Sequence, residues 1–307
     1  MTPTDTTPER APLGSSHAEL IAEMAHRFAP SPAGPRSGRG RIEAGGRRTR
    51  PDPRPVLVAV AHGSRDPAAR TTVARLLDRV RALRPGLDVR LAHLGLNEPL
   101  LDEVLDDLAR DRAAVRTAGR AAVLVPVLLG RGYHVRHDLP AALARHPRLD
   151  ASVAAPLGPH PLLADALRQR LAEAGWDDPE VGRVRRREAR DAVVLAAAGS
   201  KDPASARDAQ TQALLLAARL HAPVVPAYVS AAAPTVAQAV AVLRERGYRR
   251  IALSSYFTAP GDFARLAAAD APWLVAAPLG AAETVAELLL QRYDAALPAR
   301  TAVAAAV

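Results

Sequence analysis

The sequence repeats one strand–loop–helix pattern in tandem, and this repeat limits the possible folds more than any other feature. VLVAVAHGSRDPAA at 56–69 is matched by VVLAAAGSKDPAS at 193–205. Later segments match in the same order, and APLG occurs at 155–158 and again at 277–280. A chain with such a repeat is predicted to fold as two similar domains.

Each repeat alternates short apolar runs with amphipathic stretches. In the first repeat we expect strands at 56–61, 88–94, 121–129 and 152–157, and helices at 67–83, 99–118, from about 135, and at 161–174. Strands that alternate with helices pair in parallel and are joined by right-handed crossovers. The predicted fold class is therefore α/β, with two tandem-duplicated domains that each contain a small parallel sheet flanked by helices.

Composition suggests where the domains begin and end. We predict a disordered tail rich in Pro, Gly and Arg at 1–53, a catalytic domain at 54–176, a charged linker at 177–190, a degenerate domain at 191–298 and a C-terminal tail at 299–307. The net charge of +9 comes mainly from arginines, many of them in the tail and linker. Basic tails can bind nucleic acid, but an aromatic content of 3% leaves few rings for base stacking. We predict a solvated tail and no nucleic-acid partner.

Several classes of function are disfavoured by composition. The chain has no cysteine, so disulfides, thiolate metal sites and Cys nucleophiles are excluded, and a metal would be held by His, Asp, Glu or water. We find no long uncharged apolar run and no secretion signal, and we predict a cytoplasmic protein without a membrane partner. The nucleotide-binding pattern GxxxxGK[ST] is also missing.

Three reactive side chains follow three successive strands of the first repeat. His62 follows the first strand, Glu98 the second and His134 the third. In open parallel sheets, ligands bind beyond the carboxyl ends of the strands, so these residues are predicted to share one edge. Two imidazoles and a carboxylate would suit Fe²⁺, Co²⁺, Ni²⁺ or Zn²⁺, and neutral imidazole can also accept a proton near pH 7.

The second repeat lacks these reactive residues but keeps the scaffold around them. It has Ala198 in place of His62, Ala233 in place of Glu98, and Gly261 or Asp262 in place of His134. The retained residues are Gly199, Ser200, Asp202 and Pro203. A purely structural role for all three residues predicts no such selective loss. We infer one active half and one degenerate half.

Structural roles remain open for several of these residues. Glu98 can serve equally as a first-turn acid that complements a helix dipole. Asp66 is interpreted as an N-cap, since Asp202 persists in the degenerate half. His137 is interpreted as a surface residue, and His160, at a helix start, is a candidate for the lining of the cleft.

Four motifs in order resemble one enzyme family. AHGSRDP (61–67), NEP (97–99), GRGYHVRHDLP (130–140) and APLGPHP (155–161) are similar to segments of the sirohydrochlorin cobalt/iron chelatases, the class II chelatases that need no ATP. The likeness covers about 55–298, including the duplication of the long forms. It implies chelatase-like domains and insertion of Fe²⁺ or Co²⁺ into sirohydrochlorin, in sirohaem or cobalamin biosynthesis.

The resemblance also implies residue roles. His62, His134 and Glu98 would be the catalytic and metal-holding residues. The residues expected to bind the carboxylate-rich substrate are Ser64, Arg65, Arg131, Tyr133 and Arg136. The metal would be a substrate and no permanent cofactor is expected. The partner is a tetrapyrrole, and the duplication is compatible with a monomer that acts as an internal pseudo-dimer. The alternatives are a non-catalytic metal or tetrapyrrole carrier with the same cleft and a nucleic-acid-binding protein.

Overall fold

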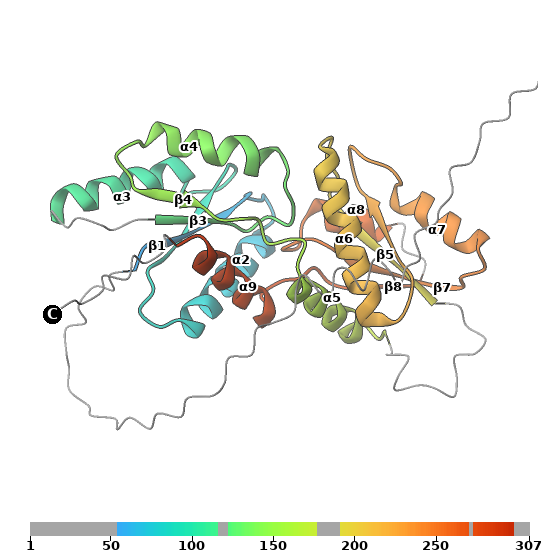
Figure 1. Cartoon of the computed structure of the whole chain (residues 1–307). Helices are drawn as coiled ribbons and strands as arrows, with labels where there is room; N and C mark the ends of the chain where they lie inside the picture. The colour runs from blue at the N-terminus through green and yellow to red at the C-terminus, as the bar shows by residue number, and fades with distance from the viewer. Residues whose placement is uncertain (1–53, 116–121, 177–190, 270–272, 298–307) are drawn as a thin grey trace, which may run out of the picture. The chain divides into compact units, whose positions relative to one another are not determined.

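The computed structural model describes residues 54–115, 122–176, 191–269 and 273–297 (Figure 1). These residues belong to one compact unit of the chain, Arg50–Val307. The predicted N-terminal tail, the predicted linker and the predicted C-terminal tail lie outside the described residues. No helix in the described part of the chain combines the length and apolarity that a membrane crossing requires.

The first sheet contains four parallel strands in the order β2-β1-β3-β4. Its strands are β1 (Val56–Ala61), β2 (Val89–His93), β3 (Ala122–Pro126) and β4 (Ala151–Val153). Its connecting helices are α2 (Pro67–Leu83), α3 (Leu101–Val115), the π-helical turn η1 (His134–Asp138) and α4 (Leu139–Arg145). β1 and β3 are buried throughout, as expected for central strands covered on both faces. We call this sheet and these helices the first lobe.

The second sheet repeats the same parallel order, β6-β5-β7-β8. Its strands are β5 (Asp191–Ala197), β6 (Val224–Tyr228), β7 (Arg250–Ser255) and β8 (Leu274–Val275). Its connecting helices are α6 (Pro203–Leu220), α7 (Val236–Glu245) and α8 (Asp262–Ala269). This second lobe confirms the predicted α/β class and the tandem duplication.

The last helix of each repeat packs on the opposite lobe. α5 (Pro161–Glu173) follows the first sheet in sequence but packs against α6, whereas α9 (Glu283–Ala295) packs against α2 (Figure 1). One hydrophobic core therefore combines side chains from both sheets and both exchanged helices. The domain boundaries predicted from the sequence stay a prediction. One helix from each predicted domain packs on the sheet and helices of the other.

The two loops after β1 and β5 share one conformation, and it explains which residues the repeats retain. Asp66 and Asp202 cap α2 and α6 by accepting hydrogen bonds from Ala68 N at 2.9 Å and Ala204 N at 2.8 Å, which confirms the predicted N-cap. Gly63 has φ +94°, and a Cβ there would lie 1.9 Å from the carbonyl oxygen of Gly95. Gly199, at φ +88°, is confined in the same way by Ser230. Only glycine fits both positions.

Strand register corrects one equivalence between the halves. Val56 pairs with Ala122 and its repeat partner Ala192 pairs with Ile251, so the third strands align with a constant offset. Continued without a gap, this offset places Phe263 opposite His134 in the alignment. The hydrogen bonds Arg136 N to Gly132 O and Arg265 N to Gly261 O support the same offset. The predicted equivalents of His134, Gly261 and Asp262, are therefore wrong by one or two residues.

Candidate functional site

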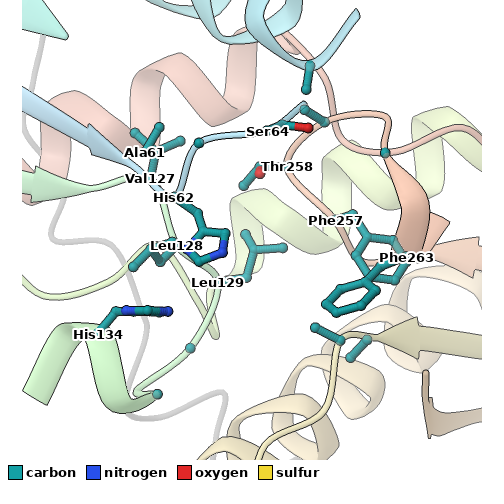
Figure 2. Close-up of a pocket in the computed structure, with 18 of the residues that line it drawn as sticks. Ala61, His62, Ser64, Val127, Leu128, Leu129, His134, Phe257, Thr258 and Phe263 are labelled. Atoms are coloured by element: carbon teal, nitrogen blue, oxygen red, sulfur yellow. The ribbon is translucent and has the colours of Figure 1, made fainter. Parts of the chain in front are cut away.

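A cavity of about 720 Å³ lies where the carboxyl ends of both sheets meet (Figure 2). The first lobe lines it with the residues that follow β1 and β3 and with the start of α2. The second lobe contributes the residues that follow β5 and β7 and one face of α6. Its size falls within the range of about 300–1,000 Å³ typical of small-molecule sites.

Two imidazoles meet at this cavity. His62 follows β1 directly and His134 is the first residue of η1, after β3. Their ring centroids lie 4.8 Å apart with the ring planes tilted by 50°. The structure thus brings together the two histidines that the sequence placed at the ends of neighbouring strands, and both line the cavity.

Asp138 orients His134. The Nδ1 atom of His134 lies 2.5 Å from Oδ2 of Asp138, one helical turn further on. Because a carboxylate only accepts hydrogen bonds, Nδ1 carries the proton and Nε2 of a neutral ring keeps its lone pair. Sequence analysis missed Asp138, although its i,i+4 spacing from His134 was the available signal.

The environment of His62 favours its neutral form. Partial desolvation in the cavity lowers the pKa of His62, the neighbouring His134 lowers it further, and Asp138 raises it in part. The balance lies below the ordinary histidine value. His62 therefore offers a lone pair at neutral pH, for a metal or for a proton.

Glu98 does not join the two histidines. Glu98 is exposed and does not line the cavity. It precedes Pro99, to which it is joined by a cis peptide bond. Within the described ranges, no group of three or more His, Asp or Glu side chains is arranged to hold a metal ion. The preceding residue, Asn97, lines the cavity instead, and its Oδ1 accepts a hydrogen bond from Ser64 N at 2.7 Å. The role of Glu98 stays a prediction.

The predicted substrate-binding arginines differ in their surroundings. Arg65 lines the cavity and makes no ion pair among the described residues. Arg131 instead binds Asp208 of α6 through its backbone N and its guanidinium, and Arg136 Nε lies 3.3 Å from Asp202. Sequence analysis missed Arg70 on α2, which lines the cavity beside Arg65.

The remaining predicted residues divide between the cavity and the scaffold. Ser64 lines the cavity, and its Oγ accepts a hydrogen bond from Asp66 N at 3.1 Å. Tyr133 also lines it, is 65% exposed, and its ring lies 4.5 Å from that of His137. His160 is not part of the lining, because it caps α5 with Nδ1 accepting from Leu162 N.

The loop that carries His134 is held at its start by the second lobe. The hydroxyl of Tyr256 donates to Leu129 O at 3.0 Å, and Asp208 accepts hydrogen bonds from the backbone N and the guanidinium of Arg131. Asp208 is 2% exposed, so its charge is compensated inside the protein. The second lobe therefore supports the segment of the first lobe that leads to His134.

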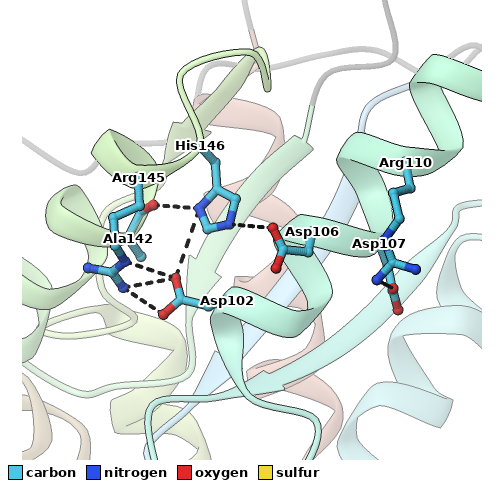
Figure 3. A network of polar contacts seen from close by, with 7 residues as sticks. All are labelled: Asp102, Asp106, Asp107, Arg110, Ala142, Arg145 and His146. Atoms are coloured by element: carbon cyan, nitrogen blue, oxygen red, sulfur yellow. Dashed lines mark hydrogen bonds and ion pairs between the residues drawn. The ribbon is translucent and has the colours of Figure 1, made fainter.

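The same segment is held at its far end by α3. η1 continues into α4, where Arg145 forms a two-pronged ion pair with Asp102 at 2.8 and 2.7 Å (Figure 3). The neighbouring His146 places Nδ1 2.8 Å from Ala142 O and Nε2 3.1 Å from Asp106 Oδ1. Both ends of the η1–α4 segment are thus fixed to packed helices.

Comparison with known proteins finds one matching family and several curated relatives. The CbiX family model matches residues 56–174 and 192–296. Sirohydrochlorin ferrochelatase of Priestia megaterium is 24% identical over 214 residues, which cover 67% of this chain and 74% of that protein. Sirohydrochlorin cobaltochelatase of Methanopyrus kandleri is 27% identical over 143 residues, which cover 39% of this chain and 96% of that protein.

Solved structures show the same fold. SirB from Bacillus subtilis with Fe³⁺ superposes with a TM-score of 0.60 at 22% identity, covering 78% of this chain and 94% of SirB. CbiX, described as the terminal enzyme for biosynthesis of sirohaem in denitrifying bacteria, gives a TM-score of 0.57 at 23% identity, covering 79% of this chain and 100% of that one. Because the family model matches both repeats and more than half of the sequence, the chain belongs to the CbiX family.

Proposed function

We propose that this protein inserts a divalent metal, Fe²⁺ or Co²⁺, into sirohydrochlorin, as a step toward sirohaem or cobalamin. The observation that carries the proposal is the His62–His134 pair, two imidazoles 4.8 Å apart at the cavity between the lobes. The relatives named above as ferrochelatase and cobaltochelatase support the choice of substrate.

The chemistry of insertion requires what the pair offers. A divalent metal replaces two pyrrole N–H protons, so the site must present a partly dehydrated metal and accept protons. Neutral His62, with its lowered pKa, is suited to either task, and His134 is oriented by Asp138. The metal is a substrate that enters and leaves with each turnover.

The rest of the cavity suits a carboxylate-rich macrocycle. Arg65 and Arg70 lie at its lining and can pair with carboxylate arms in two-pronged geometry. Tyr133 and Leu96, 65% and 60% exposed, supply apolar surface in the same cavity. Flat apolar surface beside cations matches a conjugated ring that carries acidic side chains.

Turnover of purified full-length protein tests the proposal. Sirohydrochlorin and Co²⁺ or Fe²⁺ are mixed with the protein, and the product is followed by absorbance and identified by mass. We expect many turnovers per protein, and loss of turnover in His62→Ala and His134→Ala with unchanged circular dichroism. Stoichiometric binding without turnover would instead identify a carrier. Near-normal rates in both variants would overturn the site assignment.

The physiological metal needs a separate measurement. Imidazole ligands accept several divalent ions, and affinity alone does not select among them. Competition between Fe²⁺ and Co²⁺ at equal concentration, with both products quantified by mass, gives the ratio of kcat/KM values for the two metals.

A further inference from the structure

Aromatic side chains are scarce in this chain yet concentrated at the cavity. They make up 3% of the sequence, which has only three phenylalanines. Two of these, Phe257 and Phe263, lie in the described part of the chain, and both line the cavity. Three tyrosines join them there, namely Tyr133, Tyr228 and Tyr256. This distribution indicates that aromatic surface is selected at the cavity.

Among the second-lobe aromatics that line the cavity, Phe263 is the one that core packing does not explain. Tyr228 and Tyr256 are buried in the core shared by the lobes, and Phe257 packs against the core of the second sheet. Phe263 belongs to none of these clusters and is 45% exposed. An exposed phenyl ring in a cavity is typical of a surface that a ligand covers.

Phe263 also stands where the second lobe would carry its own histidine. Strand register makes it the counterpart of His134. In Figure 2 the two imidazoles lie on one side of the cavity, and Phe263 lies on the other. The degenerate half thus presents an apolar ring toward the space that the active half lines with nitrogen ligands.

An ion pair between the lobes links the helix that carries this ring to the loop that starts at His62. Arg265, two residues after Phe263 on α8, donates to Asp66 Oδ2 at 2.6 Å. Asp66 belongs to the loop that starts at His62. The ring and the first imidazole are therefore held by connected segments, although they come from different repeats.

We propose that Phe263 is a substrate-binding residue on which one face of a planar, conjugated tetrapyrrole stacks, while the opposite face meets His62 and His134. The inference rests on the proposed function and adds to it the side from which the metal reaches the macrocycle. The imidazole lone pairs face the macrocycle from one side only, so metal is delivered from the first lobe and the second lobe supplies the backing surface. A stacked ring adds to the area that binding removes from water.

Binding of metal-free sirohydrochlorin, followed by its absorbance change, isolates this role from turnover. Full-length wild type is compared with Phe263→Ala, Phe263→Leu and Phe263→Tyr. We expect Kd to rise about tenfold in Phe263→Ala, to rise less in Phe263→Leu, and to stay near the wild-type value in Phe263→Tyr, because only tyrosine keeps the ring face. The contrast between leucine and tyrosine remains decisive even if the alanine variant folds poorly.

Leu266 provides a matched control on the same helix. It is 57% exposed, one turn after Phe263, but it does not line the cavity. We expect Leu266→Ala to bind like wild type. If Phe263→Leu and Phe263→Tyr both bind like wild type, the stacking role is overturned while the chelatase proposal stands. If wild type itself neither binds nor metallates sirohydrochlorin, the proposed function fails, and this inference fails with it.

Discussion

Asp138 shows how one residue outside the predicted set acts on both histidines. It accepts a hydrogen bond from His134 Nδ1, and its charge partly offsets the lowered pKa of His62. The sequence predicted that the two histidines would meet, because parallel strands end at one edge. It did not predict Asp138, since its i,i+4 spacing from His134 is common on helix surfaces and becomes informative only once His134 faces a cavity.

Asp138→Asn is expected to lower kcat about 10- to 100-fold, because the amide no longer fixes the tautomer of His134. Removing the anion also removes the influence that raises the pKa of His62, so that pKa should fall further. Rates across pH and an NMR titration of His62 measure both effects. An unchanged rate together with an unchanged His62 titration would show that Asp138 has no role at the site.

His160 illustrates a predicted candidate with a structural role. It caps α5, and its pKa is lowered to about 4 by burial, and further by the charge of Arg292. His160 therefore binds a proton more readily in the unfolded chain than in the folded protein. Its contribution to the free energy of unfolding is lost as pH falls from about 6.5 toward 4.

His160→Ser keeps a side-chain acceptor at the N-cap but removes the titration. Between neutral pH and pH 4, we expect the free energy of unfolding to fall by about 1–2 kcal/mol less in the variant than in wild type, after discounting for partial exposure. Urea unfolding at several pH values gives these free energies. Parallel pH profiles of the two proteins would contradict the assignment.

At the scale of elements, periodicity predicted the strands and their parallel pairing, but neither their order in the sheet nor which sheet each terminal helix covers. The apolar face of α5 carries Leu163 and Leu167, a pattern that fits either lobe equally. Only the packing of α5 on α6 and of α9 on α2 decides between them. The helix expected from about residue 135 is present and begins at His134, but its first turn is π-helical, which periodicity did not predict.

The contact between α6 and the His134 loop gives a prediction at this scale. Asp208→Ala leaves the backbone N–H of Arg131 and its guanidinium without their carboxylate partner. We expect a loss of about 2 kcal/mol in the free energy of unfolding and a fall in kcat larger than any change in KM, because the loop loses its anchor. Asp208→Asn should show smaller losses of both the free energy of unfolding and kcat than Asp208→Ala. Wild-type kcat in a destabilised Asp208→Ala protein would show that the contact serves stability alone.

At the scale of the molecule, the helix exchange predicts joint unfolding. One hydrophobic core combines both sheets, so neither lobe is complete without a helix from the other half of the sequence. We expect a single transition in urea, with coincident signals from circular dichroism and from the fluorescence of Trp176 and Trp273. A fragment ending at residue 176 should lack cooperative unfolding, because α9 no longer covers α2. Two separate transitions in the full chain would contradict this prediction.

The exchange also bears on how the two repeats diverged. Each repeat supplies a helix that covers the sheet of the other repeat. Loss of either repeat would therefore expose apolar surface on the one that remains. Selection can therefore retain both scaffolds for architectural reasons alone. With the scaffold kept in this way, the second repeat can carry the phenyl ring of Phe263 at the position that corresponds to His134.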